Sequence, residues 1–272
     1  MAAHYEKEKS RMNIRSWMAV NPEWRHLSTA ENVEEFKIVS IRTDRGWMSN
    51  ANYKSIFTNP MVAIELGLLE VLQHLVESKL VNVNQHNWNG YNTKSRHPHL
   101  LMTAMEEDEL NCFKYIMGID GIDVGSNTLR EGHDLPLICC ACDFDFDKRH
   151  LEIMIGHKSF SVNQYHQVGR KLLTPLHFII VVVLNKREDI NDDLALDKME
   201  MLLKAGADPY LVPSTPTNQH APPPMHCASA LLPPDSNTTD IHGRVTKLLN
   251  EYGTEEGRRE YDRLMDFQHS II

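Results

Sequence analysis

The sequence predicts an all-α fold made by stacking similar pairs of short helices. Units with the same order of apolar and turn residues recur along the chain. The segment that enters the hairpin after each helical pair begins at Val83, Val124, Val162 and Pro209, at spacings of 41, 38 and 47 residues. Each unit holds two short apolar stretches at helical spacing. One of these stretches contains Leu69, Leu72, Leu75 and Val76. Because one such helix cannot bury its apolar face alone, neighbouring units must stack.

The clearest unit begins and ends with strong helix signals. Thr174 can cap the amides of a helix that starts at Pro175, where a missing N–H costs nothing. Gly206 is a good helix stop, since glycine adopts the left-handed terminal conformation cheaply. The phrases Thr-Pro-Leu-His at 174–177 and Leu-Leu-Lys-Ala-Gly-Ala-Asp at 202–208 resemble the two signatures of the ankyrin repeat. This resemblance implies an ankyrin-repeat solenoid.

Degenerate copies of this template lie on either side of it. They span residues 61–84, 98–124, 135–163 and 224–253. The spacing exceeds the ankyrin period of about 33 residues, so insertions must lie in loops. We therefore expect about five repeats in residues 57–253, a helical N-terminal cap in residues 1–56 and a capping helix in residues 254–272. Three of the four tryptophans fall in the N-terminal region, at Trp17, Trp24 and Trp47.

Composition limits the partners and the compartment. The 28 Lys and Arg against 37 Asp and Glu give a net charge of −9, which argues against nucleic-acid binding. The N-terminus lacks the apolar region of a signal peptide, and no run of 18 apolar residues occurs, so neither secretion nor membrane association is expected. We interpret the five cysteines as reduced thiols of a cytoplasmic protein, with a nuclear location left open.

The residues that could hold a metal have simpler interpretations. Cys139, Cys140 and Cys142 fall on the first helix of a unit, where the ankyrin resemblance implies small buried side chains. The acidic segment that starts at Asp143 resembles the beginning of a calcium loop but has Lys148 at the glycine position. We expect no metal and no cofactor.

No catalytic motif stands out either. The sequence contains no phosphate-binding glycine loop, no serine nucleophile elbow and no zinc-protease helix motif. The resemblance implies that His177 is a structural histidine that bonds backbone groups within and between repeats. We therefore expect a protein that is not an enzyme.

The expected binding surface lies on the hairpin fingers that join the repeats. Ankyrin repeats commonly contact partner proteins through fingertips and through the concave face of the first helices. One finger is expected at residues 85–90 and another at residues 164–169, with a third that begins at Tyr210. The partner-binding residues we predict are His86, Asn87, Trp88, Tyr165, His166 and Tyr210. Aromatic side chains dominate many interfaces, although Trp88 could instead pack on a neighbouring finger.

Two acidic insertions form a second candidate surface. They run from Asp143 to Lys148 and from Lys186 to Asp197, both between the first and second helix of a unit. Such an edge could steer a basic partner, or it could be a solvated loop without a partner.

The expected function is a non-catalytic intracellular protein–protein interaction module, either an adaptor or an inhibitor. One alternative is a scaffold that self-associates into a homo-oligomer through its caps. Another is an effector with an unrecognised activity in its N-terminal region. The resemblance also suggests that Asn84 and Asn163 are hydroxylated, since they occupy the hairpin position that is modified in some family members.

Overall fold

The computed structural model describes residues 11–12, 14–28, 56–84, 99–130, 133–143, 145–184, 192–212, 221–231, 240–255, 257–259 and 262–263. These residues are mostly helical, with two short antiparallel hairpins. The helical class predicted from the sequence is thus confirmed. Contacts divide the chain into two compact units, residues 1–123 (unit 1) and 124–272 (unit 2). None of the helices in the described ranges combines the length and apolarity needed to cross a membrane.

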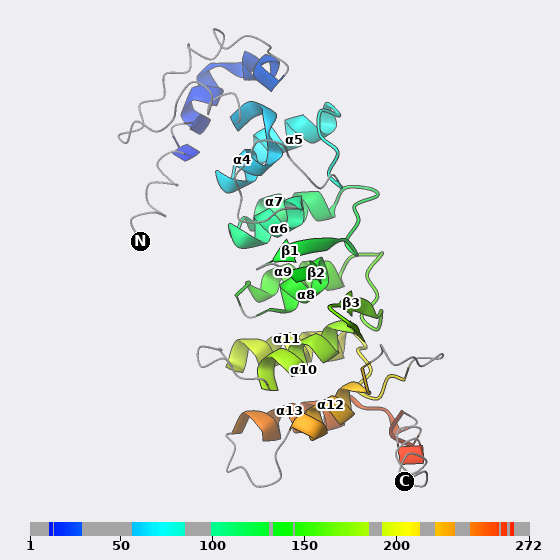
Figure 1. Cartoon of the computed structure of the whole chain (residues 1–272). Helices are drawn as coiled ribbons and strands as arrows, with labels where there is room; N and C mark the ends of the chain where they lie inside the picture. The colour runs from blue at the N-terminus through cyan, green and yellow to red at the C-terminus, as the bar shows by residue number, and fades with distance from the viewer. Residues whose placement is uncertain are drawn as a thin grey trace. The chain divides into compact units, whose positions relative to one another are not determined.

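Unit 1 contains two helical pairs in which like helices are neighbours (Figure 1). The pairs are α4 (Pro60–Glu65) with α5 (Leu69–Glu77), and α6 (Leu100–Glu106) with α7 (Leu110–Met117). Helix α4 contacts α6, and α5 contacts α7. The first helices and the second helices therefore form two layers.

Local capping explains where the first helices of unit 1 begin. The side chain of Asn59 accepts a hydrogen bond from the Met61 amide at 2.9 Å, and Pro60 follows it at the first helical position. At α6 the ring of His99 plays the same part, since its Nδ1 accepts from the Leu101 amide at 3.1 Å. Almost all residues of both helices are buried, and each helix contacts the other as well as its own partner.

Within unit 1, the N-terminal region packs against the first helical pair. Residues 14–20 are helical, and η1 (Pro22–Ser28) contacts α5. Trp24 is only 3% exposed, with its ring centroid 5.7 Å from that of Phe57. Residues 29–55, with Trp47 among them, lie outside the described residues. The cap boundary at residue 56 therefore stays a prediction, as does the C-terminal one at 254.

Unit 2 repeats the layered arrangement with three helical pairs. The pairs are α8 (Leu137–Cys142) with α9 (Lys148–Ile155), α10 (Pro175–Leu184) with α11 (Asp192–Lys204), and α12 (Pro224–Leu231) with α13 (Asp240–Tyr252). Helix α10 lies between α8 and α12, and α11 lies between α9 and α13. Each helix thus buries apolar surface against a like helix and against its own partner.

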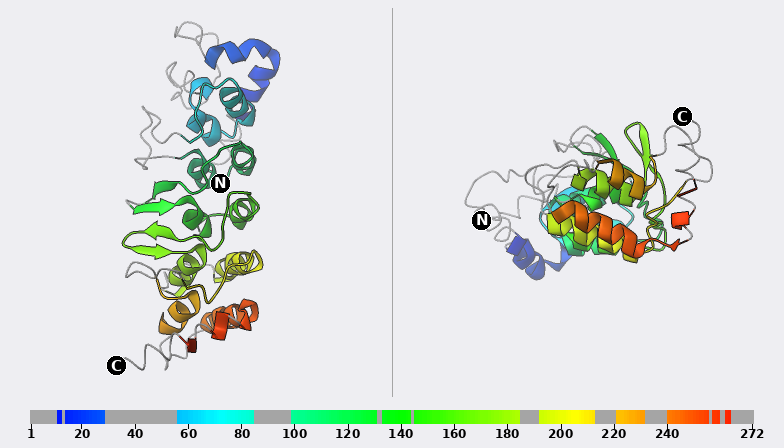
Figure 2. Two further views of the ribbon diagram at one scale, coloured as in Figure 1. Left: turned by 90° about the vertical axis from the view of Figure 1, so that its right-hand side faces the viewer. Right: turned by 90° about the horizontal axis from the view of Figure 1, so that it is seen from below.

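Two hairpins project from the helical layers of unit 2. They are β1 (Asn127–Arg130) with β2 (His133–Pro136), and β3 (His166–Val168) with β4 (Lys171–Leu173). Strand β2 contacts β3, so the hairpins lie side by side, as Figure 2 shows.

The helix signals read from the sequence hold in unit 2, with one correction. Helix α10 begins directly after Thr174, and Gly206 follows α11 with a φ of +92°. The predicted acidic loop up to Asp197 is wrong in its second half, because α11 already begins at Asp192. Carboxylates in a first helical turn are favoured by the exposed amides and the helix dipole there.

Candidate interaction surface

A tight turn forms the tip of the β3–β4 hairpin. Val168 pairs with Lys171, which leaves Gly169 and Arg170 as a two-residue turn. Gly169 has a φ of +59°, a conformation that favours glycine at the first turn position of such hairpins. The side-chain amide of Gln167 donates to the Gly169 carbonyl at 2.6 Å and braces the turn.

Polar side chains are exposed along this hairpin and the segment before it, which we call the β3–β4 finger (residues 164–173). The exposed residues are Gln164, Gln167, Gly169, Arg170 and Lys171. Within the described part of the chain, the Arg170 guanidinium takes part in no ion pair. The predicted finger ended too early, at Gly169, because the second strand extends the projection to Leu173.

The base of the finger is fixed by an asparagine side chain. The Nδ2 of Asn163 donates to the Gly206 carbonyl at 2.9 Å, and its Oδ1 accepts from the Asp208 amide at 2.9 Å. In unit 1, Asn84 makes the corresponding bonds to Gly121 and Asp123 at 2.8 and 2.9 Å. These paired bonds hold the chain before each finger against the turn that follows the next helical pair.

Tyr165 and His166 begin the finger as half-buried residues. The Tyr165 hydroxyl donates to the Leu211 carbonyl at 3.5 Å, and its ring centroid lies 6.0 Å from that of His177. Burial, with the nearby Asp208 carboxylate adding to it, raises the pKa of Tyr165 to about 12. Burial also lowers the pKa of His166. Part of each side chain thus belongs to the finger's foundation.

The prediction that Tyr210 is an exposed finger residue is wrong. Tyr210 is 5% exposed, and its amide donates to the Asp208 carboxylate at 2.9 Å. Its ring occupies the space that a side chain at Gly253 would need, and its hydroxyl reaches Asn250 at 3.5 Å. Tyr210 therefore packs against the end of α13 and its surface is not available to a partner.

The other three predicted finger residues, His86, Asn87 and Trp88, lie outside the described residues. Their proposed binding role stays a prediction.

His177 bonds the backbone on both sides of its ring, as the sequence led us to expect. Its Nδ1 lies 2.7 Å from the Thr174 hydroxyl and 3.2 Å from the Thr174 amide, and its Nε2 lies 2.7 Å from the Pro222 carbonyl. Because a carbonyl can only accept, the Nε2 carries the proton and Nδ1 is the acceptor. The histidine joins α10 to the segment that precedes α12.

The cysteines on α8 are packing residues. Cys139 and Cys140 are fully buried, and Cys142 is 4% exposed. Burial raises the pKa of Cys139 and of Cys142, which keeps these thiols protonated. The described residues contain no group of three or more His, Cys, Asp or Glu side chains that could hold a metal ion.

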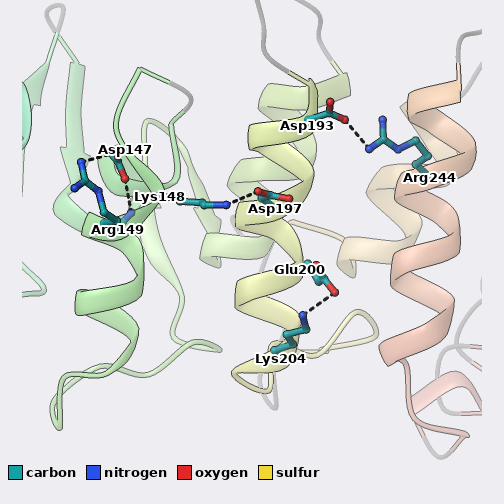
Figure 3. A network of polar contacts seen from close by, with 8 residues as sticks. All are labelled: Asp147, Lys148, Arg149, Asp193, Asp197, Glu200, Lys204 and Arg244. Carbon is teal, nitrogen blue, oxygen red and sulfur yellow. Dashed lines mark hydrogen bonds and ion pairs between the residues drawn. The ribbon is translucent and has the colours of Figure 1, made fainter.

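Three carboxylates of the acidic edge, those of Asp147, Asp193 and Asp197, pair with nearby cations, as Figure 3 shows. Lys148 pairs with Asp197 at 2.6 Å, and Arg244 pairs with Asp193 at 2.7 Å. These side chains come from α9, α11 and α13, so the ion pairs run between neighbouring second helices. These carboxylates already have cationic partners within the chain.

No protein-family model, curated protein or solved structure matches this chain.

Sequence reasoning missed Arg170 and Lys171 because it searched the fingers for aromatic side chains. A signal for them existed. Residues 153–187 contain no Asp or Glu, although the chain as a whole has 37 of them in 272 residues. Such a gap in an acidic protein marks a segment with a different charge, and the finger lies in the middle of it.

Proposed function

We propose that this protein is a non-catalytic interaction module of the ankyrin-repeat type, which binds a protein partner through its hairpin fingers and the face of its first helices. Two layers of like helices in each unit, joined in unit 2 to projecting hairpins, support this proposal. The signature phrases at 174–177 and 202–208 support it from the sequence.

The observation that carries the proposal is that the β3–β4 finger is hydrogen-bonded to the rest of unit 2 at its base and exposed to solvent at its turn. Asn163 and Tyr165 tie the finger to the turn after α11, while Gln167 and Arg170 stand in solvent. A binding surface gains affinity when its side chains are held in place before the partner arrives, because less conformational entropy is lost. Recognition residues commonly sit on loops that a rigid scaffold positions in this way.

Site-specific photo-crosslinking tests this proposal. A benzophenone amino acid replaces Gln167 on the finger in one variant and Lys247 on α13 in a matched control, since both positions are exposed. In an extract of cells that express the protein, we expect a discrete cross-linked protein from position 167 and none from position 247. The captured protein is then purified and its binding to the full chain measured by calorimetry. Equal capture at both positions, or none at position 167, would count against the proposal.

A further inference from the structure

The 3-10 helix η1 is anchored on α5 by a tryptophan. Trp24 is 3% exposed, and its ring centroid lies 5.7 Å from that of Phe57 and 5.3 Å from that of His74 on α5, the latter edge to face. The guanidinium of Arg25 lies 4.8 Å from the centroid of the same ring. Because a buried aromatic ring contributes a large apolar area, Trp24 is the main anchor of this short segment.

A second contact with α5 lies at the last residue of η1, Ser28. Its hydroxyl lies 2.7 Å from the Arg25 carbonyl and 3.0 Å from Nε2 of His74. Nε2 also lies 3.2 Å from the Arg25 carbonyl, and Nδ1 lies 3.3 Å from the Ser78 hydroxyl. Because a carbonyl can only accept, Nε2 carries a proton, and the Ser28 hydroxyl accepts from it while donating to the carbonyl. Docking of η1 thus uses Ser28 as a donor and as an acceptor.

The sequence around Ser28 has the pattern of a protein-kinase substrate. Arg25 stands three positions before Ser28, and no other serine or threonine of the 272 residues has an arginine at that distance. Arginine-directed kinases recognise this arrangement through acidic groups beside their active site. Arg25 is exposed and Ser28 is half-buried. Since a kinase takes its substrate in extended form, it competes with α5 for this segment.

We propose that Ser28 is a phosphorylation site and that its phosphate releases η1 from α5. The kinase transfers the γ-phosphoryl group of ATP to the serine. A bond forms between phosphorus and the Ser28 Oγ, the bond from phosphorus to the ADP oxygen breaks, and the hydroxyl proton passes to the general base of the kinase. This inference concerns unit 1 and does not depend on the binding role proposed for the β3–β4 finger.

A phosphate does not fit the docked arrangement as the hydroxyl does. Phosphoserine has no Oγ proton to donate to the Arg25 carbonyl, and its oxygens bring about −1.5 to −2 charges at pH 7. An acceptor then faces an acceptor where a hydrogen bond of 2.7 Å lies in the unmodified chain. The new charge also lies at the C-terminal end of a helix, where the last carbonyls already place partial negative charge.

The charged groups nearby do not offset this loss. The Arg25 guanidinium lies over the Trp24 ring, so turning toward the phosphate would uncover the anchor of η1. His74 already donates through Nε2 to the segment that would carry the phosphate, which therefore gains no additional donor there. Helix α5 also carries two carboxylates, Glu70, which pairs with Arg15, and Glu77. Phosphorylation should therefore shift the equilibrium toward released η1.

The first measurement asks whether Ser28 is a substrate. The full-length chain is incubated with Mg-ATP and the activated kinase domain of calcium/calmodulin-dependent protein kinase II, which is arginine-directed, and phosphopeptides are mapped by mass spectrometry. We expect phosphate on Ser28, and incorporation at least about tenfold slower in Arg25→Gln. No phosphate on Ser28, or equal rates in the two chains, would overturn the proposed site.

The second measurement asks whether the phosphate releases η1. The four tryptophans are replaced by 5-fluorotryptophan, and the fluorine resonance of Trp24 is assigned with Trp24→Phe. In the chain with phosphoserine encoded at position 28, we expect at least about half of the Trp24 signal to move to the position it has in urea. Phosphoserine at Ser16 is the matched control, since Ser16 is exposed in the helix before η1, and should leave the Trp24 signal in place.

Three results would overturn the release. They are a Trp24 signal that stays in place after phosphorylation at Ser28, a signal that resists urea better than in the unmodified chain, and an equal shift from phosphoserine at Ser16. The chain that the kinase has phosphorylated after folding is measured beside the encoded one, so a folding defect of the encoded variant does not decide the result. Circular dichroism checks that each chain keeps its helices.

Discussion

Asn163 holds the backbone of Asp208 through its side-chain amide, although 45 residues separate them. The carbonyl oxygen of the amide accepts from the Asp208 N–H at 2.9 Å, while its nitrogen donates to the Gly206 carbonyl at 2.9 Å. Asn84 stands in the same relation to Asp123 in unit 1. One side chain thus satisfies a backbone acceptor and a backbone donor of the turn that follows α11.

Replacing Asn163 by aspartate tests whether both halves of the amide matter. The substitution keeps the acceptor for Asp208 but places a carboxylate oxygen against the Gly206 carbonyl, where Nδ2 now donates. Because the donor is lost and two acceptors then face each other, we expect a loss of about 1–3 kcal/mol in the free energy of unfolding. Urea denaturation followed by circular dichroism measures it.

Asn250→Asp is the control for the same substitution at an exposed position. The Asn250 side chain donates to the Thr246 carbonyl within its own helix, and the Oδ1 that accepts from the Tyr210 hydroxyl at 3.5 Å is kept in aspartate. The free energy of unfolding of this variant should change by less than about 0.5 kcal/mol. Equal effects at positions 163 and 250 would show that the turn does not depend on the amide.

Signals that act over a few residues were readable from the sequence. Helix α10 starts after Thr174, and Gly206 follows the last helix of the same unit. Both signals depend on backbone groups within one helical turn of Thr174 or Gly206. The structural role of His177 was readable for the same reason, because Thr174 lies three positions before it.

Features that depend on distant partners were not readable. Tyr210 carries the residue type of a binding hot spot, and only the absence of a side chain at Gly253 makes room for its ring. From the sequence, Asp193 and Asp197 were predicted to form a negatively charged edge. Their partners, Arg244 and Lys148, lie on neighbouring helices about 50 positions away in the sequence. A single sequence does not reveal such pairings, so exposure and net field could not be predicted.

Gly67 is expected to be more sensitive to substitution than Gly121, although both have positive φ values, +61° and +80°. A Cβ at Gly67 would collide with the guanidinium of Arg11, which pairs with Glu109 and donates to the Leu66 carbonyl at 2.8 Å. Alanine at Gly67 therefore displaces this contact in addition to straining the backbone. Urea unfolding should show a loss of about 1 kcal/mol for Gly121→Ala and at least about twice that for Gly67→Ala.

The comparison isolates the contact with the Arg11–Glu109 ion pair because no atom lies within 4 Å of the corresponding Cβ position at Gly121. If the two alanine variants unfold at the same urea concentration, the Arg11 contact contributes nothing measurable.

Lys198 is fully buried and its ammonium group holds the segment between α8 and α9. Its Nζ donates to the carbonyls of Ala141 at 2.9 Å and Phe146 at 2.6 Å, and also to that of Asp143. Lys198→Met keeps much of the side-chain volume but leaves these carbonyls without their donor. We expect a loss of at least about 3 kcal/mol in the free energy of unfolding, measured by urea denaturation.

Lys204→Met serves as the control for the loss of a lysine from the same helix. Lys204 is 61% exposed and pairs with Glu200 one turn earlier, so its removal should cost less than about 0.5 kcal/mol. A Lys198→Met protein as stable as the Lys204→Met protein would mean that the three carbonyls find other donors.

The stability of the fold should fall in mildly acidic solution because of His177. Burial lowers the pKa of His177 to about 4, against about 6.5 for an unfolded histidine. Between these two pH values the unfolded chain binds a proton that the folded chain does not, so lowering the pH favours unfolding. The contribution is complete above about pH 6.5 and is lost as the pH falls toward 4. Its size is on the order of 3 kcal/mol.

Substitution by glutamine separates this residue from the other groups that titrate in the same range. His177→Gln can still donate to the Pro222 carbonyl, but it has no proton to take up, and any contribution of His166 is the same in both proteins. The variant should be less stable than wild type at pH 7.5, because it lacks the ring nitrogen that faces Thr174, and the difference should narrow by about 2–3 kcal/mol at pH 4.5. Urea midpoints at half-unit pH steps measure this convergence. Parallel curves across the range would mean that His177 keeps its charge state on folding, so the buried ring would have to find an acceptor for a second proton.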